Sequence, residues 1–166
     1  MPASRPMRAL TSATLTVLLL AWGCGGAAAR SPDPSGARLW TAADLRLLDK
    51  SLISEMSGTG VAYTYVLRGK AYGALLLHRE TTGDPELHVK VNDFFVVLGG
   101  EAEVRVGGRV AGEKAAGAGE KRGRDLVGGM LYKVAAGDIL FVPANHWLQV
   151  VIAQGEVLRA MVIKAQ

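Results

Sequence analysis

Three side chains in the middle of the chain have the types and spacing of metal ligands. Glu86 and His88 are two residues apart, so on a strand their side chains point to the same face. Asp93 follows five residues later, at the start of an apolar run. One imidazole and two carboxylates suit a divalent transition metal (Mn, Fe, Ni or Zn) better than a closed structural zinc site. Because two carboxylates in one small cavity repel each other, a cation or a protonated His88 would stabilise this arrangement.

A second group of candidates lies near the C-terminus. His146 is a candidate fourth metal ligand if a strand begins there, whereas in a turn it would face solvent. Trp147 and Gln149 follow as candidate ligand-binding residues, Trp147 through its stacking face, although a tryptophan on a strand equally suits a core position. His78 ends an apolar run and is a weaker candidate for a site residue.

Several other chemistries find no support. The single cysteine, Cys24, excludes an intrachain disulfide and a cysteine-cluster metal site. No G-x-S-x-G motif is present, and the Gly-Gly pairs do not lead from a strand into a helix, so neither a serine nucleophile nor a phosphate loop is expected. The basic residues alternate with acidic ones instead of forming a stripe, which argues against a nucleic-acid partner.

Residues 1–29 read as a secretory signal. Arg5 and Arg8 form a short basic segment, and the apolar run 9–22 is shorter than the ~20 residues of a membrane span. Small residues at 27–29 predict cleavage before Arg30 and a periplasmic or extracellular protein. Alternatively, Gly23-Cys24 resembles the end of a lipobox, and lipidation at Cys24 would anchor the protein to a membrane. Without residues 1–29 the chain has 17 basic and 15 acidic residues, so the net charge falls from +4 to +2.

The rest of the chain must position these side chains. Residues 30–40 read as a linker, and Thr41 reads as the N-cap of an amphipathic helix over 42–56. From Gly60 the pattern alternates, and it predicts strands at 61–67, 71–77, 86–91, 94–98, 102–106, 131–134, 139–142, 147–152 and 157–163. Gly99-Gly100 is expected to form a turn, and the Gly-rich stretch 107–130 a long loop, either a mobile lid or a poorly ordered insert. The pattern indicates one all-β domain over 41–166, a sandwich or barrel with one N-terminal helix.

These motifs, in this order, resemble a known family. Glu86-Leu87-His88, Asp93 and Gly100 are similar to the first motif of the cupin superfamily, H-x-H, three or four residues, E, six residues, G. Residues 137–143 are similar to the start of its second motif, and residues 119–123 to a G-E-x-R-G segment of small exported bacterial cupins. The resemblance covers about residues 42–164. It implies a small jelly-roll barrel, a site in the barrel mouth and a homodimer.

The chain departs from that pattern at the metal ligands. Glu86 stands where the first histidine is usual, and Leu148 falls on the final metal-binding histidine, so the resemblance implies a degenerate metal site. Three functions remain open. The barrel could bind a small polar or carbohydrate-like ligand, with no reaction assigned. It could be a metal-dependent enzyme that uses Glu86, His88 and Asp93 for Lewis-acid or oxygen chemistry. It could also be a non-catalytic structural barrel.

Overall fold

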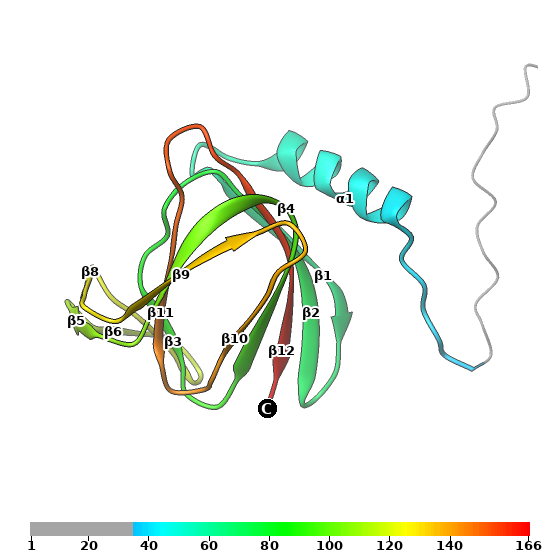
Figure 1. Ribbon diagram of the computed structural model, residues 1–166. Coiled ribbons are helices and arrows are strands. Elements are labelled where there is room, and N and C mark those ends of the chain that lie inside the picture. Colours follow the sequence, from blue (N-terminus) through cyan, green and yellow to red (C-terminus); the bar gives the residue numbers. More distant parts are fainter. Residues whose placement is uncertain (1–34) are drawn as a thin grey trace, which may run out of the picture. The chain divides into compact units, whose positions relative to one another are not determined.

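The computed structural model describes residues 35–166, of which Leu39–Gln166 form one compact unit (Figure 1). The predicted signal segment, with Cys24, and the start of the linker lie outside the described residues. Among the described residues, no helix has the length and apolar character needed to cross a membrane.

Helix α1 (Ala42–Glu55) confirms the helix expected over 42–56. Its first turn is held by a capping box, in which the Asp44 N–H donates to Thr41 Oγ1 at 3.2 Å and the Thr41 N–H donates to Asp44 Oδ2 at 2.8 Å. Asp49 and Leu52 are the buried residues of this helix, which packs against β1 and β2. The polar Asp49 on that buried face needs a partner from the sheet.

The sheet is antiparallel and curls around the core, as Figure 1 shows. Its strands follow the path β1-β2-β12-β4-β11-β3-β7-β6, with β9 and β10 paired to β4, while β5 and β8 form a separate pair. The strand bounds are β1 (Val61–Arg68), β2 (Tyr72–Arg79), β3 (Glu86–His88), β4 (Asn92–Val106), β5 (Arg109–Ala111), β6 (Lys114–Gly117), β7 (Glu120–Arg122), β8 (Asp125–Val127), β9 (Met130–Ala135), β10 (Ile139–Val142), β11 (Trp147–Val151) and β12 (Leu158–Ala165).

The turn expected at Gly99-Gly100 is wrong, because β4 runs through both residues as one 15-residue strand. The first half of β4 pairs with β10 and β12, and the second half pairs with β9 and β11. The pairing with β12 shifts register between Arg159 and Ala160, next to the two glycines. Gly100 has a φ of +72°, and a Cβ there would overlap the Val157 carbonyl. The glycines therefore bend a continuous strand, which lets one strand serve both halves of the curled sheet.

The long loop expected over 107–130 is also wrong in its main feature, since this stretch contains the short strands β5 to β8. Strand β7 pairs with β3, residue Glu86 lying opposite Arg122 and His88 opposite Glu120. Most of the glycines that suggested a loop lie between strands, and Gly117 is the last residue of β6. Gly108, with a φ of +87°, lies so close to the Val127 carbonyl that a Cβ would sit 2.7 Å from it. The high glycine content led the prediction to miss these strands, of which β7 contributes Glu120 and Arg122 to the cavity described below.

The inner face of the sheet forms an apolar core. Val104, Leu148, Leu158 and Ala160 are at most 1% exposed, and each alternates with neighbours that point outward. Complete burial of one such valine or leucine side chain stabilises the fold by about 1.5–3 kcal/mol. Leu148, at the position where the family resemblance places a metal-binding histidine, is therefore part of the core.

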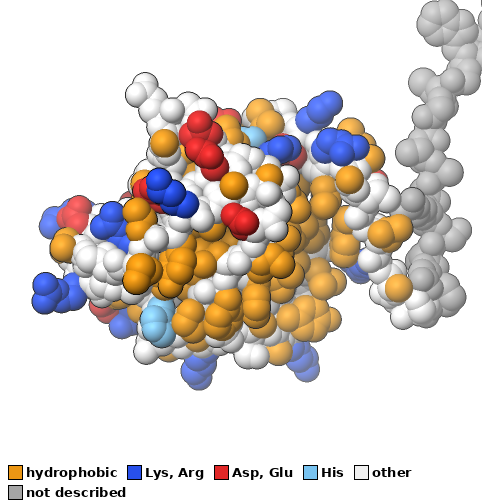
Figure 2. Space-filling model, in the orientation of Figure 1, with side chains coloured by type: hydrophobic (Ala, Val, Ile, Leu, Met, Phe, Trp, Pro, Cys, Tyr) orange, Lys and Arg blue, Asp and Glu red, His pale blue; other side chains and the backbone are white. Residues whose placement is uncertain are grey.

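The outer face of the same sheet carries a second apolar surface, which Figure 2 shows over β10, β12 and β2. In register across β10, β4 and β12 lie two apolar rows, and we call them together the outer apolar face. The rows are Phe141, Phe94 and Ile163, and Ile139, Val96 and Met161. Ile139 is 68% exposed and Phe141 49% exposed.

Candidate functional site

A cavity of about 260 Å³ lies inside the curled sheet. Its apolar wall comes from strands on both sides of the barrel, and includes Tyr65, Leu75, Leu77, Phe95, Val150 and Val162. Its polar wall consists of Arg79, Glu86, His88, Asp93, Glu120, Arg122 and Lys164. The structure thus brings Glu86, His88 and Asp93 to one cavity. Alternation predicted the shared face of Glu86 and His88, and Asp93 joins them from the start of β4.

One end of the polar wall is built on His88, Asp93 and Lys164. His88 Nδ1 lies 2.7 Å from Asp93 Oδ2, and the Lys164 ammonium donates to Asp93 Oδ1 at 2.7 Å. The same ammonium lies 3.3 Å from His88 Nε2. A protonated Lys164 requires Nε2 to be the acceptor, so Nδ1 carries the proton that His88 donates to Asp93. Asp93 is 2% exposed, and both of its oxygens are bonded.

The charge on Asp93 is stabilised by these neighbours. Burial by itself would raise the pKa of the Asp93 carboxyl. The hydrogen bond from His88 and the positive charge of Lys164 outweigh burial, and the pKa lies below its ordinary value. Asp93 is therefore an ionised carboxylate at neutral pH, and Lys164 is its counterion.

The other end of the polar wall is built on the paired strands β3 and β7. Arg122 Nη1 lies 2.6 Å from Glu86 Oε2, and Arg122 Nη2 donates to Glu120 Oε1. Burial by itself would lower the pKa of Arg122, but the two carboxylates outweigh it and raise the pKa. One guanidinium thus neutralises part of the charge of two carboxylates.

A divalent metal is the group that the fold implies, and the donor set tests it. Ligand atoms of Glu86, His88 and Glu120 lie within 4.8 Å of one another. However, Arg122 bonds to both carboxylates, and Lys164 faces the free nitrogen of His88. An ion among these donors would lie against a guanidinium and an ammonium, which repel it. The residues present therefore fit two internal cations and do not fit a metal ion.

The structure does not bring the C-terminal candidates to the cavity. His146 is exposed in the turn before β11, where its Nδ1 lies 3.0 Å from the Ala144 carbonyl oxygen. It therefore takes the second of the two placements considered from the sequence. Trp147 and Gln149 alternate with the buried Leu148 and Val150, so they point away from the barrel interior.

Gln149 has a structural partner instead of a cavity position. Its Nε2 donates to the Gly83 carbonyl oxygen at 3.0 Å. Neither Trp147 nor Gln149 lines the cavity, because a period of two along β11 gives the inward positions to Leu148 and Val150.

Four polar residues of the cavity were missed as site residues from the sequence. Lys164 continues the inward series that ends in Val162, and Arg79 continues the series Leu75, Leu77. A period of two extended to these strand ends would have found both. Glu120 and Arg122 are also two residues apart, but their strand was not predicted because the surrounding sequence is rich in glycine.

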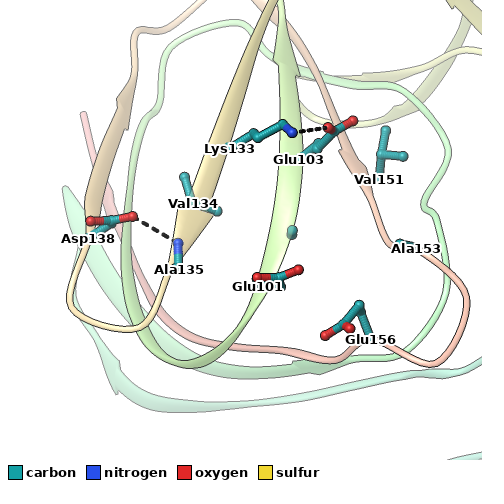
Figure 3. Close-up of a pocket in the computed structure, with 10 residues that line it drawn as sticks. Glu101, Glu103, Lys133, Val134, Ala135, Asp138, Val151, Ala153 and Glu156 are labelled. Carbon is teal, nitrogen blue, oxygen red and sulfur yellow. Dashed lines mark hydrogen bonds and ion pairs between the residues drawn. The ribbon is translucent and has the colours of Figure 1, made fainter.

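A larger pocket, of about 580 Å³, lies where β4 and β9 meet the segment after β11 (Figure 3). It contains none of the predicted site residues. Its acidic side chains include Glu103, 3.8 Å from Lys133 Nζ, and Asp138, which accepts from the Ala135 N–H at 2.8 Å. The second of these bonds closes the turn between β9 and β10, which is a structural role. We therefore assign the candidate site to the smaller cavity.

His78 forms a second histidine–aspartate pair, on the outer face of the sheet. Its Nδ1 lies 2.7 Å from Asp49 Oδ1 of helix α1, and its Nε2 lies 3.1 Å from Glu80 Oε1. Arg159 Nη1 lies 3.8 Å from the other Asp49 oxygen. His78 is 3% exposed, and the pair connects α1 to β2.

Comparison with known proteins identifies the architecture. No family model and no curated protein matches this chain. Among solved structures, the cupin domain of Cnp3 from Schizosaccharomyces pombe has a TM-score of 0.50 at 10% identity, covering 69% of this chain and 71% of that chain. An uncharacterized conserved protein with a double-stranded β-helix domain from Klebsiella pneumoniae has a TM-score of 0.54 at 16% identity, covering 78% of this chain and 90% of that chain.

The protein therefore has a cupin fold, a jelly-roll β-barrel with one N-terminal helix. This confirms the fold that the motifs implied. At these identities the likeness shows the fold alone, and the function must be argued from the side chains of the cavity.

Proposed function

We propose that this protein binds a small polar or carbohydrate-like ligand in the barrel cavity, without a metal ion. The observation that carries the proposal is the cavity of about 260 Å³, with an apolar wall facing a charged one. A pocket that combines an apolar wall with convergent polar groups is typical of small-molecule sites. The aromatic and aliphatic wall would hold the carbon skeleton, and the remaining N–H donors of Lys164 and Arg122 would bond its polar groups.

Internal charge balance supports binding without a metal. Among the described residues that line the cavity, three carboxylates face three side-chain cations. Two of these cations contact the carboxylates that a metal would need, because Lys164 bonds to Asp93 and Arg122 bonds to Glu86 and Glu120. The repulsion expected between the carboxylates is therefore relieved by the chain itself.

A thermal-shift screen of the full chain tests this function. The probes are neutral sugars, polyols, hydroxy acids and sugar acids, and separately Mn, Fe, Ni and Zn salts. We expect at least one organic probe to raise the melting temperature, since a ligand that binds the native state stabilises it, and no stoichiometric metal by elemental analysis. Val61→Phe, at a cavity-lining position, should abolish the organic shift, and Ile139→Phe, on the outer face, should not.

Two results would overturn the proposal. A metal-dependent stabilisation that disappears in His88→Ala would favour the metal-enzyme function. An organic shift that survives Val61→Phe would place the ligand outside the cavity.

We propose that a second copy of the chain covers the outer apolar face. Its two rows contain no charged side chain, so the same face of another copy matches it without buried charge. Patches of this kind on an isolated soluble domain commonly mark an interface. Sedimentation of the full chain should give a dimer that Phe141→Glu converts to a monomer. Val127→Glu, at an exposed position of β8, is the matched control, and a wild-type monomer would contradict the proposal.

We also propose that the protein is exported, on the pattern of residues 1–29. Cell fractionation should recover it outside the cytoplasm. Palmitate labelling that is lost in Cys24→Ser would favour the lipoprotein alternative, and cleavage before Arg30 without labelling would favour the soluble one.

A further inference from the structure

We infer that Arg79 forms a carboxylate-binding subsite in the cavity, so that the ligand is a small organic acid. The inference rests on the proposed function and names the class of its ligand. Arg79 ends β2 and contributes to the cavity wall, with Val61 of β1 opposite it on one side and Leu158 of β12 on the other.

Arg79 differs from the other two cations of the cavity in its partners. Lys164 and Arg122 each have a carboxylate oxygen within 2.7 Å. In the part of the chain that the structure describes, no carboxylate oxygen lies within 4.0 Å of an Arg79 nitrogen. Arg79 Nη1 donates to the Thr81 carbonyl oxygen at 3.3 Å, and Arg79 Nε is buried without a partner. A guanidinium has five N–H donors, so most of those of Arg79 are not used.

The guanidinium of Arg79 packs against the loop that contains Gly83. A Cβ at Gly83 would overlap this guanidinium, so the two groups lie in close contact and a side chain at position 83 would displace Arg79. Gly83 itself is fixed to β11, because its N–H donates to the Val150 carbonyl oxygen at 2.9 Å and its carbonyl accepts from Gln149. The guanidinium therefore packs against a loop that is itself fixed to β11.

The charges around Arg79 indicate what kind of ligand group would suit it. Burial lowers the pKa of Arg79, Arg122 acts in the same direction, and Glu86 and Asp84 act against it. Arginine stays protonated in proteins, so Arg79 is a partly buried charge without an ion pair. A planar carboxylate accepts two parallel hydrogen bonds from a guanidinium, which suits this position.

The surrounding charges favour a carboxylate over a phosphate group. Glu86, Asp93 and Glu120 line the same cavity, and a doubly charged phosphate would meet stronger repulsion from them than a singly charged carboxylate. One negative charge at Arg79 would leave the remaining N–H donor of Lys164 to bond a hydroxyl or carbonyl group of the ligand.

The test uses acetate and its neutral analogue acetamide on the ¹⁵N-labelled full chain, at constant ionic strength. We expect acetate, and not acetamide, to shift the Arg79 Nε–Hε signal and the Gly83 amide signal along a saturating curve. Arg79→Gln should weaken acetate binding, followed at Gly83, by at least about tenfold. Arg79→Lys should also weaken it, since an ammonium keeps the charge but loses the planar fork.

Arg105 provides the matched control. Its Nε is also buried without a partner, but Arg105 does not line the cavity, and its Nη1 donates to the Leu126 carbonyl oxygen. Arg105→Gln should leave the acetate response unchanged. A response equal for acetate and acetamide, or one that survives Arg79→Gln, would overturn the inference.

The experiments distinguish a failure of the carboxylate subsite from a failure of the proposed ligand-binding function. If a neutral sugar or polyol binds in the cavity, as judged by Val61→Phe, and acetate does not bind at Arg79, then the carboxylate subsite alone is wrong. If neither binds, the proposed ligand-binding function is wrong as well.

Discussion

Two histidine–aspartate pairs lie on opposite faces of the curled sheet. In each, His Nδ1 is 2.7 Å from the aspartate, and a basic side chain lies near the carboxylate. They differ in what lies beyond the second ring nitrogen. His78 Nε2 meets Glu80, and helix α1 covers the pair. His88 Nε2 meets Lys164 and the cavity. The outer pair, His78 and Asp49, therefore connects two elements of the fold. The inner pair, His88 and Asp93, has space for a ligand beside it.

The comparison also separates two uses of a buried charge. Asp49 attaches helix α1 to the sheet, because its carboxylate bonds to His78 of β2 on the buried face of the helix. Asp93 is placed to orient the Lys164 ammonium and the His88 ring at a cavity wall. The same residue types at the same distance give different roles, since the neighbouring element either fills the adjacent space or leaves it open.

The largest expected effect is at the inner pair. Asp93→Asn leaves the Lys164 ammonium without its carboxylate, and we expect the free energy of unfolding to fall by about 3 kcal/mol in urea denaturation. The double variant Asp93→Asn, Lys164→Met should recover more than half of this loss, because it removes the stranded charge. Asp125→Asn breaks an exposed pair with Arg124 and should cost little. An Asp93 effect as small as that of Asp125 would contradict the role of the inner pair.

The outer pair should give a smaller effect of a different kind. Asp49→Ala leaves the buried His78 Nδ1 without its partner, and we expect a loss of about 2 kcal/mol in the free energy of unfolding. Binding of the probe identified for the cavity should be unchanged, because Asp49 lies on the outer face. A loss of affinity comparable to that in Lys164→Met would erase the distinction between the two pairs.

The inner pair should also make the free energy of unfolding depend on pH. The folded-state pKa of Asp93 is below its ordinary value, so as the pH falls the unfolded chain takes up the proton first. The contribution of Asp93 is therefore complete above the ordinary aspartate pKa of about 4 and is lost as the pH falls further through the folded-state value. The difference in unfolding free energy between wild type and Asp93→Asn should shrink below pH ~4. A difference that stays constant there would contradict this assignment.

The smallest expected effect concerns the element that covers the outer pair. Thr41→Ala removes the side-chain half of the capping box and should cost about 1 kcal/mol. Hydrogen exchange should become faster at the backbone amides of α1, while the amides of β3 and β4, which carry the inner pair, keep their protection. Equal acceleration at β3 and β7 would show that the two faces are coupled.

Much of the fold followed from local pattern. The spacing of Leu45, Leu48 and Leu52 with Thr41 at the cap predicted α1 to within one residue, and the alternation after Gly60 predicted most strands. Glycine content misled the prediction at 99–100 and 107–130. A glycine that allows a bend or a close approach in a strand looks the same, along the sequence, as one that ends the strand.

The candidate site was predictable in part. Glu86, His88 and Asp93 reach one cavity because a period of two places them on the inner face. Lys164 reaches it from a strand 71 residues beyond Asp93, and no local pattern contains that pairing. Trp147 was predicted from its residue type, but its register on β11 turns it away.

The sequence by itself determined that the chain forms a β-rich barrel with one capped helix, and that its carboxylates and histidine would meet on one face. Only the tertiary structure decided what neutralises them. Periodicity fixes the face on which a side chain lies, while its partners across the barrel depend on strand order and register. Strand order and register decided that Lys164 and Arg122 face the carboxylates, and that Arg79 lines the cavity with its Nε buried and without a hydrogen-bond partner among the described residues.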